Sequence, residues 1–151
     1  MEHFPSIMTS YETALMLERM IAHFNEWGYG LWAAELKETK ECIGFIGLSH
    51  PRFENEMTPC VEIGWRLKYE YWGKGLATEG AKEVLRYAFE DLDISHLNSW
   101  TAIPNKGSER VMQKIGMKYK GTFLHPNLPP NDPLCEHVIY SITQQEYRVF
   151  S

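Results

Sequence analysis

The chain has 151 residues, of which 44% are hydrophobic, and its formal net charge of −5 is inconsistent both with intrinsic disorder and with the basic surface of a general nucleic-acid-binding protein. Its apolar runs are shorter than the roughly 18 residues of a membrane span, and residues 1–5 lack the cationic start of a signal peptide. We therefore expect one cytoplasmic domain over residues 1–151, with neither nucleic acid nor a membrane as a partner.

The first predicted element is a helix over residues 9–27. Thr9 and Glu12 have the spacing of a capping box, in which two side chains satisfy backbone N–H groups at a helix start. Gly28 and Gly30 end the helix. Four apolar residues recur at helical spacing within this segment: Ala14, Leu17, Ile21 and Phe24.

Three predicted strands follow. Residues 31–36 and 42–49 are joined by a short polar turn, which indicates an antiparallel hairpin. The second of these strands is almost continuously apolar, so we expect it to be covered on both faces. A polar loop over residues 51–59 leads to a third strand over residues 60–67.

A glycine-rich turn over residues 73–78 opens a long helix that ends near Asp91. A fourth strand over residues 96–103 follows, so strand, helix and strand form a β-α-β unit whose two strands should be parallel. The helix has one apolar stripe, formed by Ala77, Ala81, Val84, Leu85, Ala88, Phe89 and Leu92.

The C-terminal part predicts a short helix from Asn105 to Ile115 and two strands over residues 118–123 and 137–143, followed by a helical turn. The two strands flank a proline-rich loop over residues 125–134. The order of elements predicts an α/β (α+β) fold with a mixed sheet and helices packed on it, because an all-parallel sheet would need helices between all of its strands.

The cysteines and histidines give no metal-binding pattern. Cys42, Cys60 and Cys135 are widely spaced and form no Cys-x-x-Cys pair, and the six histidines form no ligand-spaced cluster. We therefore expect no metal, and each cysteine to be a free, mostly buried thiol.

The glycine-rich turn is the most informative segment. Glycines let the chain turn tightly and expose N–H groups at a helix N-terminus, which together make a site for a phosphate-sized anion. A plain tight turn is the alternative. The segment fits neither a P-loop, because no Ser or Thr follows Lys74, nor a dinucleotide fingerprint, because Thr78 stands where the third glycine belongs.

Residues 73–80 resemble the acyl-CoA pyrophosphate loop of the GNAT superfamily of N-acetyltransferases. The pattern of that loop, Gln/Arg-x-x-Gly-x-Gly/Ala, aligns with Trp72, Gly75 and Ala77. Trp72 departs from the first position, as is common in the RimJ/RimL-like branch of ribosomal-protein-alanine acetyltransferases. Three further segments resemble that branch in order: Glu62-Ile63-Gly64-Trp65, then Asn105-x-x-Ser108 with Gly116-Met117, and His137-Val138-Ile139-Tyr140.

The resemblance spans roughly residues 30–143. Members usually begin with a further strand and the start of a helix, whereas this chain begins inside the first helical region. We expect this departure to affect the acceptor side. The resemblance implies a mostly antiparallel sheet with a splayed parallel pair in its middle and helices on both faces. It also allows a homodimer, for which the sequence identifies no interface.

The resemblance implies acetyl-CoA as cosubstrate and assigns residues to it. The backbone N–H groups of the loop would hold the pyrophosphate, and a strand would lie along the pantetheine arm. Asn105 would cap a helix and contact the cofactor. The residues so assigned are Trp65, Arg66, Leu67, Gly73, Lys74, Gly75, Leu76, Ala77 and Thr78.

Catalysis needs a donor to the departing thiolate and a base for the amine. Ser108 is the candidate donor by its place in the branch pattern, and helix capping is its alternative. Glu62 is the candidate base, against a plain exposed strand residue, and His50 is a second candidate. A backbone N–H within residues 63–65 would stabilise the oxyanion.

The resemblance therefore implies an N-acetyltransferase acting on a primary amine, most simply the α-amine of a protein or peptide N-terminus. A small-amine acetyltransferase, for an antibiotic or a polyamine, and a non-catalytic acyl-CoA-binding module are the alternatives. Four aromatic residues are expected near the cleft, where packing is favoured over a substrate cage: Trp32, Trp65, Tyr71 and Trp72.

Overall fold

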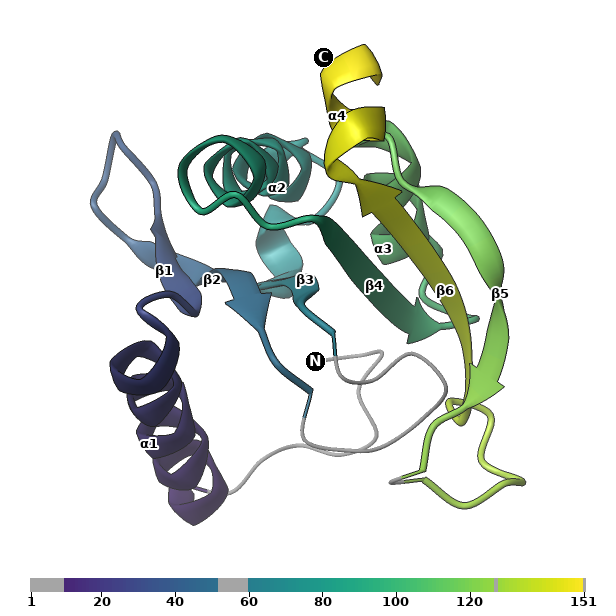
Figure 1. Cartoon of the computed structure of the whole chain (residues 1–151). Coiled ribbons are helices and arrows are strands. Elements are labelled where there is room, and N and C mark those ends of the chain that lie inside the picture. Colours follow the sequence, from purple (N-terminus) through teal and green to yellow (C-terminus); the bar gives the residue numbers. More distant parts are fainter. Residues whose placement is uncertain (1–9, 52–59, 127, 151) are drawn as a thin grey trace.

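The computed structural model describes residues 10–51, 60–126 and 128–150. The first half contains α1 (Ser10–Trp27), β1 (Leu31–Glu35), β2 (Cys42–Ser49), β3 (Glu62–Leu67), a 3₁₀ turn (Tyr69–Tyr71) and α2 (Leu76–Arg86) (Figure 1). A π-helical turn (Tyr87–Asp91) extends α2, and β4 (His96–Ala102), α3 (Lys106–Lys114), β5 (Lys118–Leu124), β6 (Glu136–Thr143) and α4 (Gln144–Phe150) follow. The predicted elements are confirmed in type and order. The predicted cap at Thr9 and most of the 51–59 loop lie outside the described residues.

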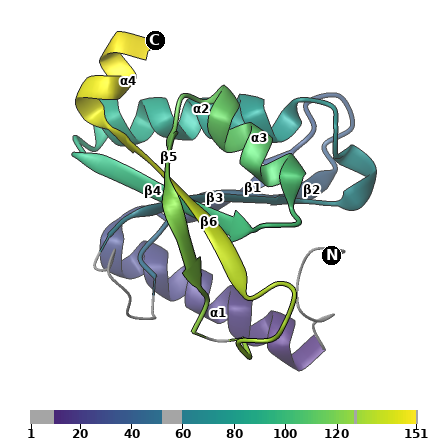
Figure 2. The ribbon, with the colours of Figure 1, turned by 90° about the vertical axis from the view of Figure 1, so that its right-hand side faces the viewer.

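The six strands form one sheet in the order β1-β2-β3-β4-β6-β5. Only β3 and β4 run parallel, and they share a single residue pair in register, Glu62 with Asn98. Figure 2 shows α1 on one face of the sheet and α2 and α3 on the other. The predicted mixed sheet, its splayed parallel pair and the helices on both faces are therefore confirmed.

The main core lies between the sheet and the α2 side. The apolar stripe of α2 is buried as predicted, and Leu85 and Phe89 pack there with Leu48, Ile63 and Ile142. Each such side chain contributes roughly 1.5–3 kcal/mol through its removal from water. This core fixes the positions of β3 and of the loop that leads into α2.

The apolar residues that recur at helical spacing in α1 are mostly exposed. Ala14 is exposed, Leu17 is 50% exposed and Ile21 is 62% exposed, while Phe24 is half-buried. The helix is instead held through its C-terminal end, where His23 donates from Nδ1 to the carbonyl of Tyr29 at 2.9 Å and accepts from the backbone N–H of His50 at 2.9 Å. Helical spacing shows that a helix is amphipathic, but not which of its faces meets the sheet.

Cys60 and Cys135 are buried free thiols, as expected, but Cys42 is exposed because it begins β2 beyond the core. Within the described ranges, no helix is long and apolar enough to cross a membrane. The same residues bring no three His, Cys, Asp or Glu side chains together in a way that could hold a metal ion.

Candidate functional site

The turn before α2 is built on two left-handed glycines. Gly73 has φ +74° and Gly75 has φ +77°, a conformation that only glycine adopts without strain. Gly75 stands at the N-cap of α2, and no side chain there accepts from the first turn. The N–H groups of that turn are therefore left for an external acceptor, which suits an anion.

The gap between β3 and β4 opens one residue after their single pair. The Asn98 N–H donates to Val61 O at 3.0 Å, and the buried Ser99 hydroxyl donates to Ile63 O at 2.8 Å. On the other edge of β3, the Lys68 N–H donates to Ile43 O at 2.8 Å. Because backbone groups alternate between the two edges of a strand, those of Trp65 face the gap. An extended ligand arm could pair there as an added strand.

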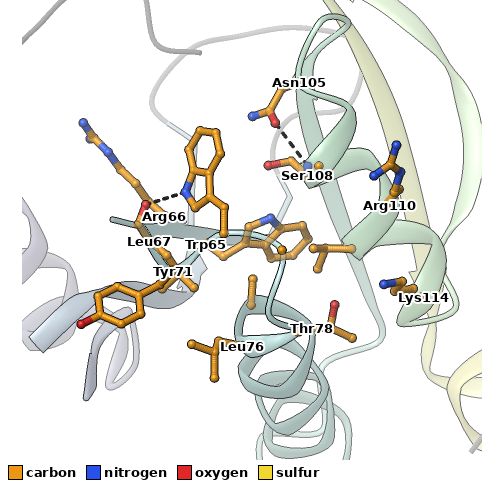
Figure 3. A pocket seen from close by; sticks show the side chains of 16 residues that line it. Trp65, Arg66, Leu67, Tyr71, Leu76, Thr78, Asn105, Ser108, Arg110 and Lys114 are labelled. Carbon is orange, nitrogen blue, oxygen red and sulfur yellow. Dashed lines mark hydrogen bonds between the residues drawn. The ribbon is translucent and has the colours of Figure 1, made fainter. Parts of the chain in front are cut away.

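A cavity of about 330 Å³ joins the glycine turn, β3 and the N-terminal part of α3. Figure 3 shows Trp65, Arg66 and Leu67 on one side of it and Ser108, Arg110 and Lys114 on the other. Nearly all residues assigned to the cofactor line this cavity: Trp65, Arg66, Leu67, Gly73, Gly75, Leu76, Ala77, Thr78 and Asn105. Residues far apart in the sequence thus meet in one hollow.

Lys74 and Trp32 are not brought into this cavity. The Lys74 ammonium lies over the ring of Tyr71, 5.6 Å from its centre, and its side chain does not line the hollow. Trp32 lies in a separate groove against α2. Tyr71 and Trp72 do line the cavity, and the Trp72 indole N–H donates to Leu67 O at 2.8 Å, which fixes the rim next to the glycine turn.

Four lining residues were missed by the sequence interpretation: Gly107, Arg110, Val111 and Lys114. They follow one another at helical spacing on the α3 face that also bears Ser108. Their helical spacing from Ser108 was the sequence signal that could have identified them. Arg110 and Lys114 bring two cations from α3 to a cavity that Arg66 of β3 also lines.

The cap of α3 is divided between two residues. The Asn105 side chain accepts from the Ser108 N–H at 3.2 Å, so Asn105 is the N-cap, as predicted. The backbone N–H of Ser108 donates to this cap, and Ser108 also lines the cavity. Its hydroxyl has no hydrogen-bond partner among the described residues, so it is available to a ligand.

Glu62 lies beside the gap and does not line the cavity. The Ser49 hydroxyl donates to its Oε1 at 3.5 Å, the one side-chain hydrogen bond of this carboxyl among the described residues. Burial with so little compensation raises the pKa of Glu62 to about 8. A carboxyl with this pKa exchanges its proton near neutral pH, which is what an acid–base group needs.

His50 has other partners. Its Nε2 lies 2.6 Å from the Tyr29 hydroxyl, and its ring stacks on Trp27 at 3.7 Å. Burial lowers the pKa of His50 below its usual value. These contacts hold the end of β2 against the end of α1. Of the two candidate bases, Glu62 is the one that is paired with a β4 residue.

The family model described as Acetyltransferase (GNAT) domain matches residues 1–118. The chain belongs to the GNAT acetyltransferase family. Members of this family use acetyl-CoA.

Relatives agree with this membership. The protein YkkB of Bacillus subtilis strain 168 is 35% identical over 133 residues, covering 83% of this chain and 76% of its own. The FsC-acetyl coenzyme A-N(2)-transacetylase of Aspergillus fumigatus is 34% identical over 125 residues, covering 80% of this chain and 52% of its own. The acetyltransferase structure from Agrobacterium tumefaciens str. C58 has a TM-score of 0.70 at 30% identity, covering 92% of this chain and 74% of that one.

Proposed function

We propose that this GNAT domain transfers the acetyl group of acetyl-CoA to a primary amine, namely the α-amine of a protein or peptide N-terminus. One observation supports it above all. The cavity runs from the glycine turn to Trp65, whose backbone groups face the gap between β3 and β4, and Glu62 is paired with Asn98 where that gap begins. A thioester and an amine would therefore meet beside a group that can take a proton.

The residues of the cavity fit acetyl-CoA. The N–H groups after Gly75 suit the pyrophosphate, and the ammonium and guanidinium of Lys114 and Arg110 add positive charge for phosphate oxygens. The gap-facing backbone groups of Trp65 suit the amides of the pantetheine arm. Bound there, acetyl-CoA would supply an activated acetyl group.

The base in this proposal is Glu62. An α-ammonium has a pKa of about 8, close to the value of about 8 for Glu62, so transfer of its proton to Glu62 Oε1 or Oε2 is nearly isoenergetic. The ε-ammonium of a lysine, with a pKa near 10.4, would lose its proton to this carboxyl far less readily. This match favours an α-amine.

Ser108 would stabilise the departing sulfur by a hydrogen bond. The amine nitrogen forms the C–N bond as the C–S bond breaks, and the Ser108 hydroxyl donates to the sulfur. Of the two protons that the ammonium loses, one leaves through Glu62 to water and the other ends on the thiol of CoA. Atoms and charge then balance without a metal.

A small amine is the second candidate acceptor. It is favoured by the name of the Aspergillus relative, an N(2)-transacetylase whose acyl donor is acetyl coenzyme A, at 34% identity. The acceptor panel described below separates it from peptide N-termini.

The first test is thermal unfolding with and without acetyl-CoA, with ATP and NAD as controls. A ligand at 100 Kd should stabilise the protein by about 2.7 kcal/mol, which is roughly 5–10 °C for a domain of this size. Stabilisation by acetyl-CoA and CoA alone, followed by CoA release with an amine, supports the proposal. Stabilisation without release to any amine would instead support a non-catalytic binding module.

A further inference from the structure

The face of the sheet opposite the main core has its own set of side chains. Glu62 and Asn98 are paired across β3 and β4, so their side chains lie on the same face. Gly64 and Trp100, two residues further along each strand, share that face. It is the α1 side, because Ile63, which points the other way, is fully buried against α2.

Gly64 leaves open space next to Glu62. Among the described residues, a Cβ built on Gly64 would meet no atom within 4 Å, whereas one on Gly47, on the neighbouring strand, would clash with the Gly30 carbonyl oxygen. Gly64 is not among the glycines with positive φ, so its backbone does not require glycine. The missing side chain therefore leaves room on the face of the sheet that bears Glu62.

An aromatic wall, defined by Trp100, Phe123, His125 and His137, lies on the same face. The rings of Trp100 and Phe123 meet edge to face at 5.9 Å, and Phe123 and His137 are 5.5 Å apart. His125 lies 5.1 Å from His137. All four residues are half-buried, so part of each residue is exposed to solvent.

The aromatic wall is uncharged near neutral pH. Burial lowers the pKa of both His125 and His137, and the His137 Nδ1–H donates to the Cys135 carbonyl at 3.1 Å. Along the described strands β3, β4, β5 and β6, Glu62 is the one carboxyl on this face. A second ammonium, as in a polyamine, would find no anionic partner on these strands.

We infer that the acceptor is an amine that bears an uncharged aromatic ring a few bonds away, with the amine at Glu62 and the ring over Gly64 against the aromatic wall. The inference rests on the proposed acetyl transfer. Edge-to-face and stacked contacts between rings add about 0.5–1.5 kcal/mol to the burial of the ring itself. The ring could belong to a free arylalkylamine or to the first residue of a peptide.

The test measures kcat/KM from CoA release with matched amines. We expect 2-phenylethylamine to exceed ethylamine, and a Phe-ended peptide to exceed an Ala-ended one, each by about tenfold or more, with spermidine below both aromatic acceptors. The peptide and free-amine arms show which source of the ring is preferred. Trp100→Ala should lower kcat/KM for 2-phenylethylamine to nearly the value for ethylamine, so that the ratio of the two approaches one. Trp100→Phe should restore most of this ratio.

Two further variants guard against a folding defect. Gly64→Leu fills the open space without removing a buried side chain, and it should lower kcat/KM for 2-phenylethylamine more than for ethylamine. Tyr119→Ala removes a 56% exposed ring from the opposite face and should leave the ratio unchanged. Equal kcat/KM for all amines, or an unchanged ratio in Trp100→Ala and Gly64→Leu, would overturn this inference alone. CoA release with none of them would overturn the proposed function as well.

Discussion

Glu62, the base in the proposed reaction, is unfavourable for stability in the form that would accept a proton. The residue is half-buried, and among the described residues its carboxyl receives one side-chain hydrogen bond, from Ser49 at 3.5 Å. Ionising it in this place is costly, so its pKa rises to about 8. A carboxyl with an ordinary pKa would be too weak a base for an α-ammonium.

The pH dependence of the rate should report this residue. With an acceptor amine whose own pKa lies well below 7, we expect kcat/KM to rise with pH and to level off above about pH 8, as Glu62 loses its proton. Glu62→Gln should lower kcat by about 100-fold or more and remove the inflection. An inflection that persists in Glu62→Gln would assign the base to another group.

Residue roles were only partly accessible from the sequence. The capping role of Asn105 and the glycines of the turn follow from local rules of helix starts, and both are confirmed. Lys74 lies inside the same motif, yet its side chain turns to Tyr71, since a motif fixes the backbone of a turn but not the direction of a long side chain. The raised pKa of Glu62 depends on burial that only the folded sheet creates.

At the scale of elements, α3 contributes more to the site than its short sequence pattern indicated. Ser108, Arg110, Val111 and Lys114 share the face that lines the cavity. Lys106 is on the same helix but pairs with Glu109 at 3.6 Å and does not line the cavity. The helix therefore provides both test residues and a matched control.

Neutralising the cations of this face should weaken cosubstrate binding. Arg110→Gln and Lys114→Gln should each raise KM for acetyl-CoA by about 3–10-fold, with little change in kcat, because each removes a charge–phosphate contact of about 1 kcal/mol. Lys106→Gln should leave KM unchanged. The effect should shrink as salt is added, since screening weakens exposed charge pairs. Equal effects of all three variants would mean that only the net charge of the protein matters.

The elements themselves were largely predictable, since their periodicities and turn residues agree with the sheet order that forms. The first helix is the exception in its packing. Its apolar stripe is real, but Leu17 and Ile21 face solvent and the helix is held by His23 and by Trp27 on His50. Which face of a helix is covered depends on contacts between distant segments, and one helix cannot reveal them.

For the whole molecule, stability against pH is a balance of opposed groups. The folded state retains the Glu62 proton between about pH 4.5 and 8, where an unfolded carboxyl has lost it, so this group lowers stability as pH rises. His50, His125 and His137 have lowered pKa values, so their contribution is complete above about pH 6.5 and is lost as pH falls below it. The two trends oppose each other near neutral pH.

Glu62→Gln should separate them. At pH 8.5 the variant should melt roughly 5 °C above the wild type, which corresponds to about 2 kcal/mol after allowance for partial solvation of the carboxyl. At pH 4.5 the difference should vanish, because Glu62 is then protonated in the folded state and partly so in the unfolded state. The maximum of stability should move upward in pH. Melting curves from pH 4 to 9 measure this, and parallel curves for the two proteins would contradict it.

The single pair between β3 and β4 has a mechanical consequence. All other neighbouring strands share five to seven pairs, so the sheet consists of two three-stranded plates joined along a seam. An extended molecule seated in that seam would bridge both plates and act as a splint. A molecule bound there would then stiffen the whole width of the sheet. Without it, the protein would bend most easily along the seam, where we propose that the reaction takes place.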